Sequence, residues 1–190
     1  MSAALKLPFD MTVEEFLDWC PDDSLRWQLV DGEPQAMAPA RVGHGALQAL
    51  VAARLLNHLI ERDSPCTVVT APGIIPLVLA SKNFRIPDIG VTCSPFEAAE
   101  KNLRDPVLLV EILSPGNRRE TWSNVWTYTT IPSVREILVM RTDEIRVELL
   151  RRGPDGTWPS EPVELTGGDL ALESLGFRAP LASLYPKPLG

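Results

Sequence analysis

Apolar residues recur at helical spacing in one long segment of the chain. Within residues 43–62, about every third or fourth residue is apolar, which predicts a helix with one buried face. The residues concerned are Leu47, Leu50, Val51, Leu55, Leu59 and Ile60. Thr12-Val-Glu-Glu15 has the form of a capping box and predicts a short helix that runs through Cys20. Two further helices are predicted over residues 95–102 and 118–130.

Extended segments are predicted between and after these helices. They cover residues 26–30, 33–37, 67–71, 74–78, 85–93, 107–113, 136–140 and 146–150. Segment 107–113 is almost entirely apolar, which is typical of a strand that is buried on both faces. It is followed by a predicted helix and another strand, the order of a βαβ unit. We therefore expect an α/β (α+β) fold, a mixed β-sheet flanked by helices, in a single domain over residues 1–190 with a core of about 10–185.

Composition narrows the possible functions. The 190 residues include 18 Lys+Arg and 25 Asp+Glu, a net charge of −7. This balance argues against a protein that coats the nucleic-acid backbone, but a metal-dependent nuclease needs carboxylates at its metal site. We find no segment long enough to cross a membrane and no secretory signal. The three cysteines are widely spaced, so we expect no disulfide framework and a cytoplasmic location.

One acidic residue stands out because of its surroundings. Glu111 lies inside the apolar segment 107–113, where a carboxylate is costly unless it is paired or binds a cation. Asp88 follows Pro87, and 22 residues separate it from Glu111, the pattern of a PD-(D/E)xK nuclease core. Two carboxylates on neighbouring strands would suit Mg²⁺ or Mn²⁺. The alternative is that Glu111 pairs with Arg118 or Arg119 and that Asp88 caps a turn.

Several segments together resemble a known family. They are Thr12-Val-Glu-Glu-Phe16, Trp27-Gln-Leu-Val-Asp-Gly-Glu33, Met37-Ala-Pro39, His44, Pro87-Asp-Ile-Gly-Val91, Leu109-Val-Glu-Ile-Leu-Ser-Pro115, Tyr128 and Pro132-Ser-Val-Arg-Glu136. In order and spacing they are similar to the Uma2 family, formerly a domain of unknown function. The resemblance implies a restriction endonuclease-like fold and a Mg-dependent nuclease.

The resemblance also implies a set of site residues. The family's site has an acid before the LVDGE segment, a histidine that opens the long helix, the Asp of PD, the Glu of the apolar strand and a lysine. The corresponding residues here are Gln28, His44, Asp88, Glu111 and Asn124. Asp88 and Glu111 would hold the metal. The lysine is therefore replaced by a neutral amide, a loss that would cost about 3 kcal/mol, or about 100-fold in rate.

Other residues are candidates for contact with the substrate. Glu120 keeps an acid in the predicted helix and should share a face with Asn124. Glu33 either faces the cleft or is only a strand residue. Arg118, Arg119 and Lys82 are the basic residues that could replace the lysine.

Two functions follow from these observations. The first is a metal-dependent endonuclease that hydrolyses nucleic-acid phosphodiester bonds, impaired by Asn124, with DNA favoured over RNA as substrate and a homodimer as the expected assembly. The second is a catalytically degenerate member of the family that acts as a binding or scaffold protein.

Overall fold

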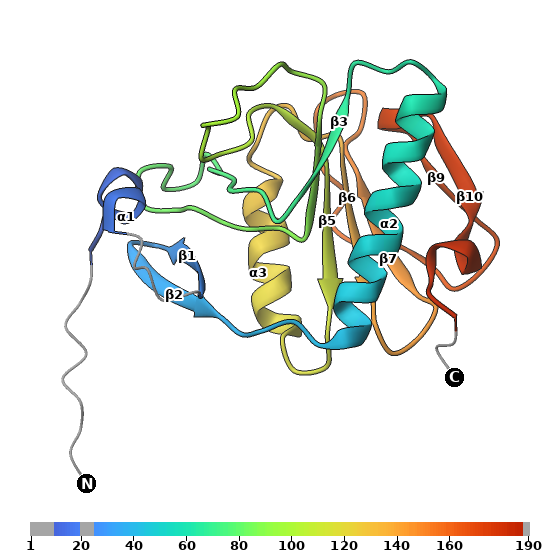
Figure 1. Ribbon diagram of the computed structural model, residues 1–190, viewed down its shortest axis with the longest axis horizontal. Helices are drawn as coiled ribbons and strands as arrows, with labels where there is room; N and C mark the ends of the chain where they lie inside the picture. Colours follow the sequence, from blue (N-terminus) through green and yellow to red (C-terminus); the bar gives the residue numbers. More distant parts are fainter. Residues whose placement is uncertain (1–9, 20–24, 188–190) are drawn as a thin grey trace, which may run out of the picture.

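A six-stranded mixed sheet with helices on both faces organises the computed structural model, which describes residues 10–19 and 25–187 (Figure 1). The sheet order is β3-β4-β5-β6-β7-β8, and only β5 and β6 run parallel. The sheet strands are β3 (Thr67–Thr70), β4 (Ile89–Thr92), β5 (Pro106–Leu113), β6 (Glu136–Arg141), β7 (Val147–Arg151) and β8 (Val163–Leu165). The predicted mixed sheet and its βαβ unit are confirmed.

The remaining elements surround this sheet. The helices are α1 (Val13–Trp19), α2 (Val42–Glu61) and α3 (Arg118–Tyr128), and two 3-10 turns span Glu173–Leu175 and Leu181–Leu184. Two separate hairpins are formed by β1 (Arg26–Val30) with β2 (Glu33–Met37) and by β9 (Asp169–Leu172) with β10 (Phe177–Pro180). The hairpin β9–β10 was not predicted, because its strands are short and flank a turn.

Alternation along β5 divides the core into two layers. Leu108, Val110 and Ile112 pack with α2 and the hairpin β9–β10. Helix α3 lies across β5 from α2 (Figure 1), and Leu109 and Leu113 pack with its inner side. Because side chains alternate between the faces of a strand, Glu111 points to the α3 face. The fold therefore places this carboxylate between the sheet and α3.

The capping box predicted before α1 and the buried face predicted for α2 can be compared with the structure. The Thr12 side chain accepts a hydrogen bond from the Glu15 amide at 3.2 Å, and the Glu15 carboxylate accepts one from the Thr12 amide at 2.7 Å, so the capping box is formed. Cys20, where this helix was predicted to end, lies outside the described residues. In α2, Leu47, Val51, Leu55 and Leu59 are buried as predicted. Ile60, also predicted on that face, is exposed.

Two predicted elements are absent from the described part of the chain. Residues 74–78 form no strand, since Ile74 makes only an isolated bridge to Arg85 and Pro76 cannot donate to a ladder. Residues 95–102 form turns rather than a helix. A segment of eight residues with an exposed surface gains too little from packing to offset the cost of helix nucleation.

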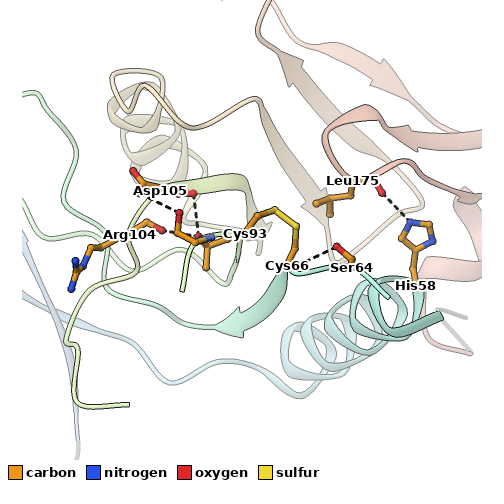
Figure 2. Close-up of a disulfide and its surroundings, with 9 residues drawn as sticks. His58, Ser64, Cys66, Cys93, Arg104, Asp105 and Leu175 are labelled. Carbon is orange, nitrogen blue, oxygen red and sulfur yellow. Dashed lines mark hydrogen bonds between the residues drawn. A yellow bond between two sulfur atoms is a disulfide. The ribbon is translucent and has the colours of Figure 1, made fainter. Parts of the chain in front are cut away.

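Cys66 and Cys93 form a disulfide, so the expectation that no disulfide is present was wrong (Figure 2). The two residues lie one step beyond the pair Thr67 and Thr92, which are opposite each other in β3 and β4. Antiparallel pairing therefore brings together two cysteines 27 residues apart in sequence. Sequence spacing alone gives no sign of this pairing.

None of the described helices is both long enough and apolar enough to cross a membrane.

Candidate active site

Glu111 is buried in β5, with 6% of its surface exposed. The Tyr128 hydroxyl, from the last turn of α3, donates a hydrogen bond to Glu111 Oε1 at 2.8 Å. Asn124, one turn earlier on α3, is a second potential donor on this side, and it acts to lower the pKa of this carboxylate. Both donors are buried on the side of α3 that faces the sheet. The alternative in which Glu111 pairs with Arg118 or Arg119 is therefore wrong, because α3 offers Tyr128 and Asn124 instead.

Asp88 lies immediately before β4 and approaches the same part of β5. Its Oδ2 accepts a hydrogen bond from the backbone amide of Ile112 at 2.6 Å, next to Glu111 in the chain. Its Oδ1 accepts one from His44 Nε2 at 2.7 Å. The backbone carbonyl of Asp88 accepts from the Gln48 side chain at 2.7 Å and from the Ala71 amide at 2.9 Å. Asp88 is thus fixed through both its side chain and its backbone.

His44 stands in the first turn of α2, as the sequence analysis expected for a site residue. With Nε2 directed at the Asp88 carboxylate, its Nδ1 lies 3.3 Å from the Ser114 hydroxyl. A carboxylate only accepts, so Nε2 carries the proton and Nδ1 is the nitrogen that accepts from Ser114. Gln48, which the sequence analysis missed, is one turn further along α2. Its spacing of four residues from His44 was the available signal, because residues four apart share a helix face.

The electrostatics of Glu111 follow from this arrangement. Burial is the main cause that raises the pKa of Glu111 well above its usual value, and the negative charge of Asp88 raises it further. Hydrogen bonds from Tyr128 and Asn124 and the positive charge of Arg85 act in the opposite direction. Burial and the neighbouring Glu111 also raise the pKa of Tyr128, so the phenol stays protonated and remains a donor.

Arg85 is a buried cation of this site that the sequence analysis missed. Its Nη1 donates to Asn124 Oδ1 at 3.1 Å and its Nη2 donates to Asn83 Oδ1 at 2.8 Å. Arg118 and Lys82, two of the three basic residues expected to replace the lysine, form ion pairs elsewhere. Lys82 bonds to Asp10 at 2.8 Å, and Arg118 lies 3.7 Å from Glu148. The third, Arg119, is exposed.

The other predicted residues are spread around this centre. Gln28 lies in the middle of β1, and Glu33 is half-buried at the start of β2, opposite Val30. Glu120 and Asn124 are four residues apart on α3, but Glu120 is exposed whereas Asn124 is buried. The last turn of α3 packs on the sheet, and the first turn projects beyond it.

The side chains of the site can be compared with the ligands that a metal ion requires. Within residues 10–19 and 25–187, no group of three or more His, Cys, Asp or Glu side chains is arranged to hold one. Asp88 and Glu111 nevertheless provide two adjacent carboxylates, whose mutual repulsion a cation would relieve. Mg²⁺ is commonly held by one or two carboxylates, with water and substrate phosphates completing its shell. The residues present therefore fit a divalent cation of this kind.

Comparison with known proteins agrees with this architecture. The family model described as Uma2, putative restriction endonuclease, matches residues 13–182. The chain belongs to the Uma2 family. An uncharacterized protein of Synechocystis is 25% identical to it over 150 residues, which cover 78% of this chain and 77% of that protein.

A solved structure has the same fold. The crystal structure of a putative nuclease from Anabaena variabilis, assigned to the same family under its earlier name DUF820, superposes with a TM-score of 0.71. The match covers 92% of this chain and 97% of the other, at 16% identity. The restriction endonuclease-like fold expected for this Uma2 protein is thereby confirmed.

Proposed function

We propose that this protein is a metal-dependent nuclease that hydrolyses nucleic-acid phosphodiester bonds, with Asp88 and Glu111 as the ligands of Mg²⁺ or Mn²⁺. The observation that carries this proposal is the meeting of the two carboxylates at β4 and β5. Asp88 Oδ2 accepts from the amide of the residue that follows Glu111, and the Asp88 charge acts on the buried Glu111. Membership of the Uma2 family supports a nucleic-acid substrate.

Each site residue has a role that its contacts support. A bound metal supplies an activated water and neutralises charge on the phosphate. His44 orients Asp88 through Nε2, and its Nδ1 can take a proton when the Ser114 hydroxyl turns away. Tyr128 and Asn124 fix the Glu111 carboxylate from α3. Gln48 holds the backbone of Asp88. These bonds limit the movement of both carboxylates before any ligand arrives.

Asn124 makes the proposed nuclease slower than a member of the family with a lysine at this position. The amide can donate a hydrogen bond but brings no charge to the pentavalent phosphate of the transition state. The loss of one such interaction costs about 3 kcal/mol, or roughly 100-fold in rate.

The proposal includes DNA as the preferred substrate and a homodimer as the active form. Both features rest on the resemblance to restriction endonucleases, in which two sites are needed to cut two strands. Sedimentation velocity checks the dimer. Cleavage of matched DNA and RNA duplexes checks the preference, and faster cleavage of RNA would contradict it.

A second candidate function is that of a catalytically degenerate binding protein. The observation that favours it is the presence of neutral amides, Gln28 and Asn124, at the two positions where the family resemblance implies an acid and a lysine. In this case Asp88 and Glu111 would keep their structural bonds without supporting turnover.

Calorimetric titration of Mg²⁺ and Mn²⁺ into the metal-free protein tests the metal site. We expect binding that disappears in Asp88→Asn and in Glu111→Gln but persists in Glu164→Gln, a control on the exposed part of strand β8. If no binding occurs with or without a DNA duplex, the nuclease proposal is wrong.

Cleavage of supercoiled plasmid then separates the two candidate functions. Slow nicking that requires Asp88 and accelerates in Asn124→Lys supports the nuclease. Metal binding without any nicking, in the wild type and in Asn124→Lys, favours the binding protein.

A further inference from the structure

Arg85 is buried, and no carboxylate of the described residues forms an ion pair with it. Only 3% of its surface is exposed, and among the described residues no carboxylate oxygen lies within 4.0 Å of its guanidinium. Its Nε is buried and has no hydrogen-bond partner in that part of the chain. Buried charges are normally paired, because desolvation is expensive. The protein therefore keeps a positive charge here at a cost in stability.

The guanidinium is held rigidly and directed at the site. Asn83, which accepts from Nη2, also accepts from the Asp31 amide at 3.0 Å and donates to the Asp31 carboxylate at 3.0 Å. This attaches Arg85 to the turn of the β1–β2 hairpin. On its other side, Nη1 bonds to Asn124 Oδ1. Because the amide oxygen of Asn124 is occupied by Arg85, its NH₂ group is directed to Glu111.

We propose that Arg85 is the positioning residue that supplies the positive charge of this site in place of the family lysine, acting through the Asn124 amide that it orients. This inference rests on the proposed nuclease function and goes beyond it, because it names the cation and its path. Since Arg85 acts through Asn124 rather than directly, its charge offsets only part of the loss caused by the missing lysine. Asn124 provides the hydrogen bond at the former lysine position, and Arg85 provides the charge from behind it.

A positive charge near the site has opposite effects on the affinities for a cation and for an anion. Arg85 weakens the binding of a divalent cation to Asp88 and Glu111 and strengthens the binding of anionic nucleic acid. A unit charge acting across about 10 Å at an effective dielectric constant of about 20 changes the affinity for a single phosphate charge roughly 15-fold. It changes the affinity for a divalent cation, which carries twice the charge, roughly 250-fold. If substitution of Arg85 caused a general structural defect, the affinities for both ligands would instead fall.

The test measures two affinities in the full-length protein and its variants. Mn²⁺ binding is measured by calorimetry without nucleic acid. Binding of a fluorescent 20-base-pair DNA duplex is measured by anisotropy in EDTA, where no cleavage can occur. The variants are Arg85→Met, which removes the charge, and Arg85→Lys, which keeps it. Arg178→Met is the matched control, an exposed arginine on β10 that pairs with Asp169. Thermal melting reports the stability of each variant.

The expected result in Arg85→Met is a Mn²⁺ affinity that is roughly 250-fold tighter and a duplex affinity that is roughly 15-fold weaker. Arg85→Lys and Arg178→Met should remain close to the wild type. Arg85→Met could instead lower the affinities for both ligands or change neither of them. If the wild type at the same time binds Mn²⁺ through Asp88, the role of Arg85 is refuted and the nuclease proposal stands. If Arg85→Lys behaves as Arg85→Met, the charge is not what matters, which also overturns the inference. A wild type that binds neither ligand refutes the nuclease proposal and this inference together.

Discussion

Replacing Glu111 with glutamine should make the metal-free protein more stable at neutral and alkaline pH. Glutamine has nearly the same volume as glutamate, and its side-chain oxygen can still accept the Tyr128 hydrogen bond. Its NH₂ group cannot accept from Asn124, and the loss of this one contact is smaller than the cost of the buried charge. The substitution removes a negative charge that burial and Asp88 both disfavour. Each unit by which the folded-state pKa of Glu111 is raised costs about 1.4 kcal/mol once the group is ionised. We expect a gain of roughly 1–3 kcal/mol at pH 8.

The pH dependence gives this prediction its sign. Glu111 has a folded-state pKa well above the value of 4.5 that applies to the unfolded chain. Below pH 4.5 the carboxyl is protonated in both states, so the two proteins should differ little. As the pH rises, the unfolded wild type loses its proton first, and the wild-type free energy of unfolding falls until the pH exceeds the folded-state pKa. The glutamine variant lacks this loss, so its advantage grows with pH.

Urea unfolding in EDTA at several pH values between 4 and 9, followed by tryptophan fluorescence, measures the difference. Glu136→Gln is the matched control, because Glu136 is also buried but is paired with Arg151 at 2.8 Å, and its loss should destabilise the protein. Mn²⁺ at about 100 times its dissociation constant should add about 2.7 kcal/mol to the wild type and nothing to Glu111→Gln. A Glu111→Gln variant that is less stable at pH 8, or a difference independent of pH, would refute the electrostatic account of Glu111.

Two further predictions concern the supports of the site. Reducing the Cys66–Cys93 disulfide, which closes a loop of 27 residues, should lower the free energy of unfolding by about 3.5 kcal/mol; equal urea midpoints with and without reductant would contradict this. Gln48→Leu removes the side-chain donor to the Asp88 carbonyl and should weaken Mn²⁺ binding roughly tenfold at an unchanged melting temperature. An unchanged calorimetric affinity would show that the Gln48 bond is not needed, because the Ala71 amide and the bonds to the Asp88 side chain suffice to hold it.

The sequence predicted those parts of the site that depend on local periodicity. An apolar strand with one acid specifies both a central position in the sheet and, by alternation, the face on which Glu111 lies. The βαβ order then places α3 over that face. The position of His44 at the start of α2 came from the family resemblance, and the structure places it against Asp88.

The parts that were missed depend on contacts between distant segments. Arg85 precedes Asp88 by three residues, but its role depends on Asn83 and Asn124, and no periodicity links these residues. The segment around Arg85 contains prolines and forms isolated β-bridges rather than a continuous ladder of strand pairing. The same reason explains the disulfide, because the register of β3 and β4 decides which cysteines meet. Basic residues near the expected lysine in sequence were therefore poor guides to the cation nearest the site in space.

The charges of the site have to be considered together. Leu29 and Phe84 exchange two backbone hydrogen bonds as an antiparallel bridge, so Gln28 is the residue opposite Arg85. Gln28 Oε1 is buried and has no hydrogen-bond partner within the described residues. The resemblance implies an acid at position 28 and a lysine at position 124, so the two neutral amides remove one charge of each sign and leave the net charge of the site unchanged. Arg85 lies opposite one of these positions and is bonded to the other. An acid at position 28 would form an ion pair with Arg85 and neutralise its charge. With glutamine there, that charge is available to Asn124 and Glu111, so the two departures from the family pattern depend on each other through Arg85.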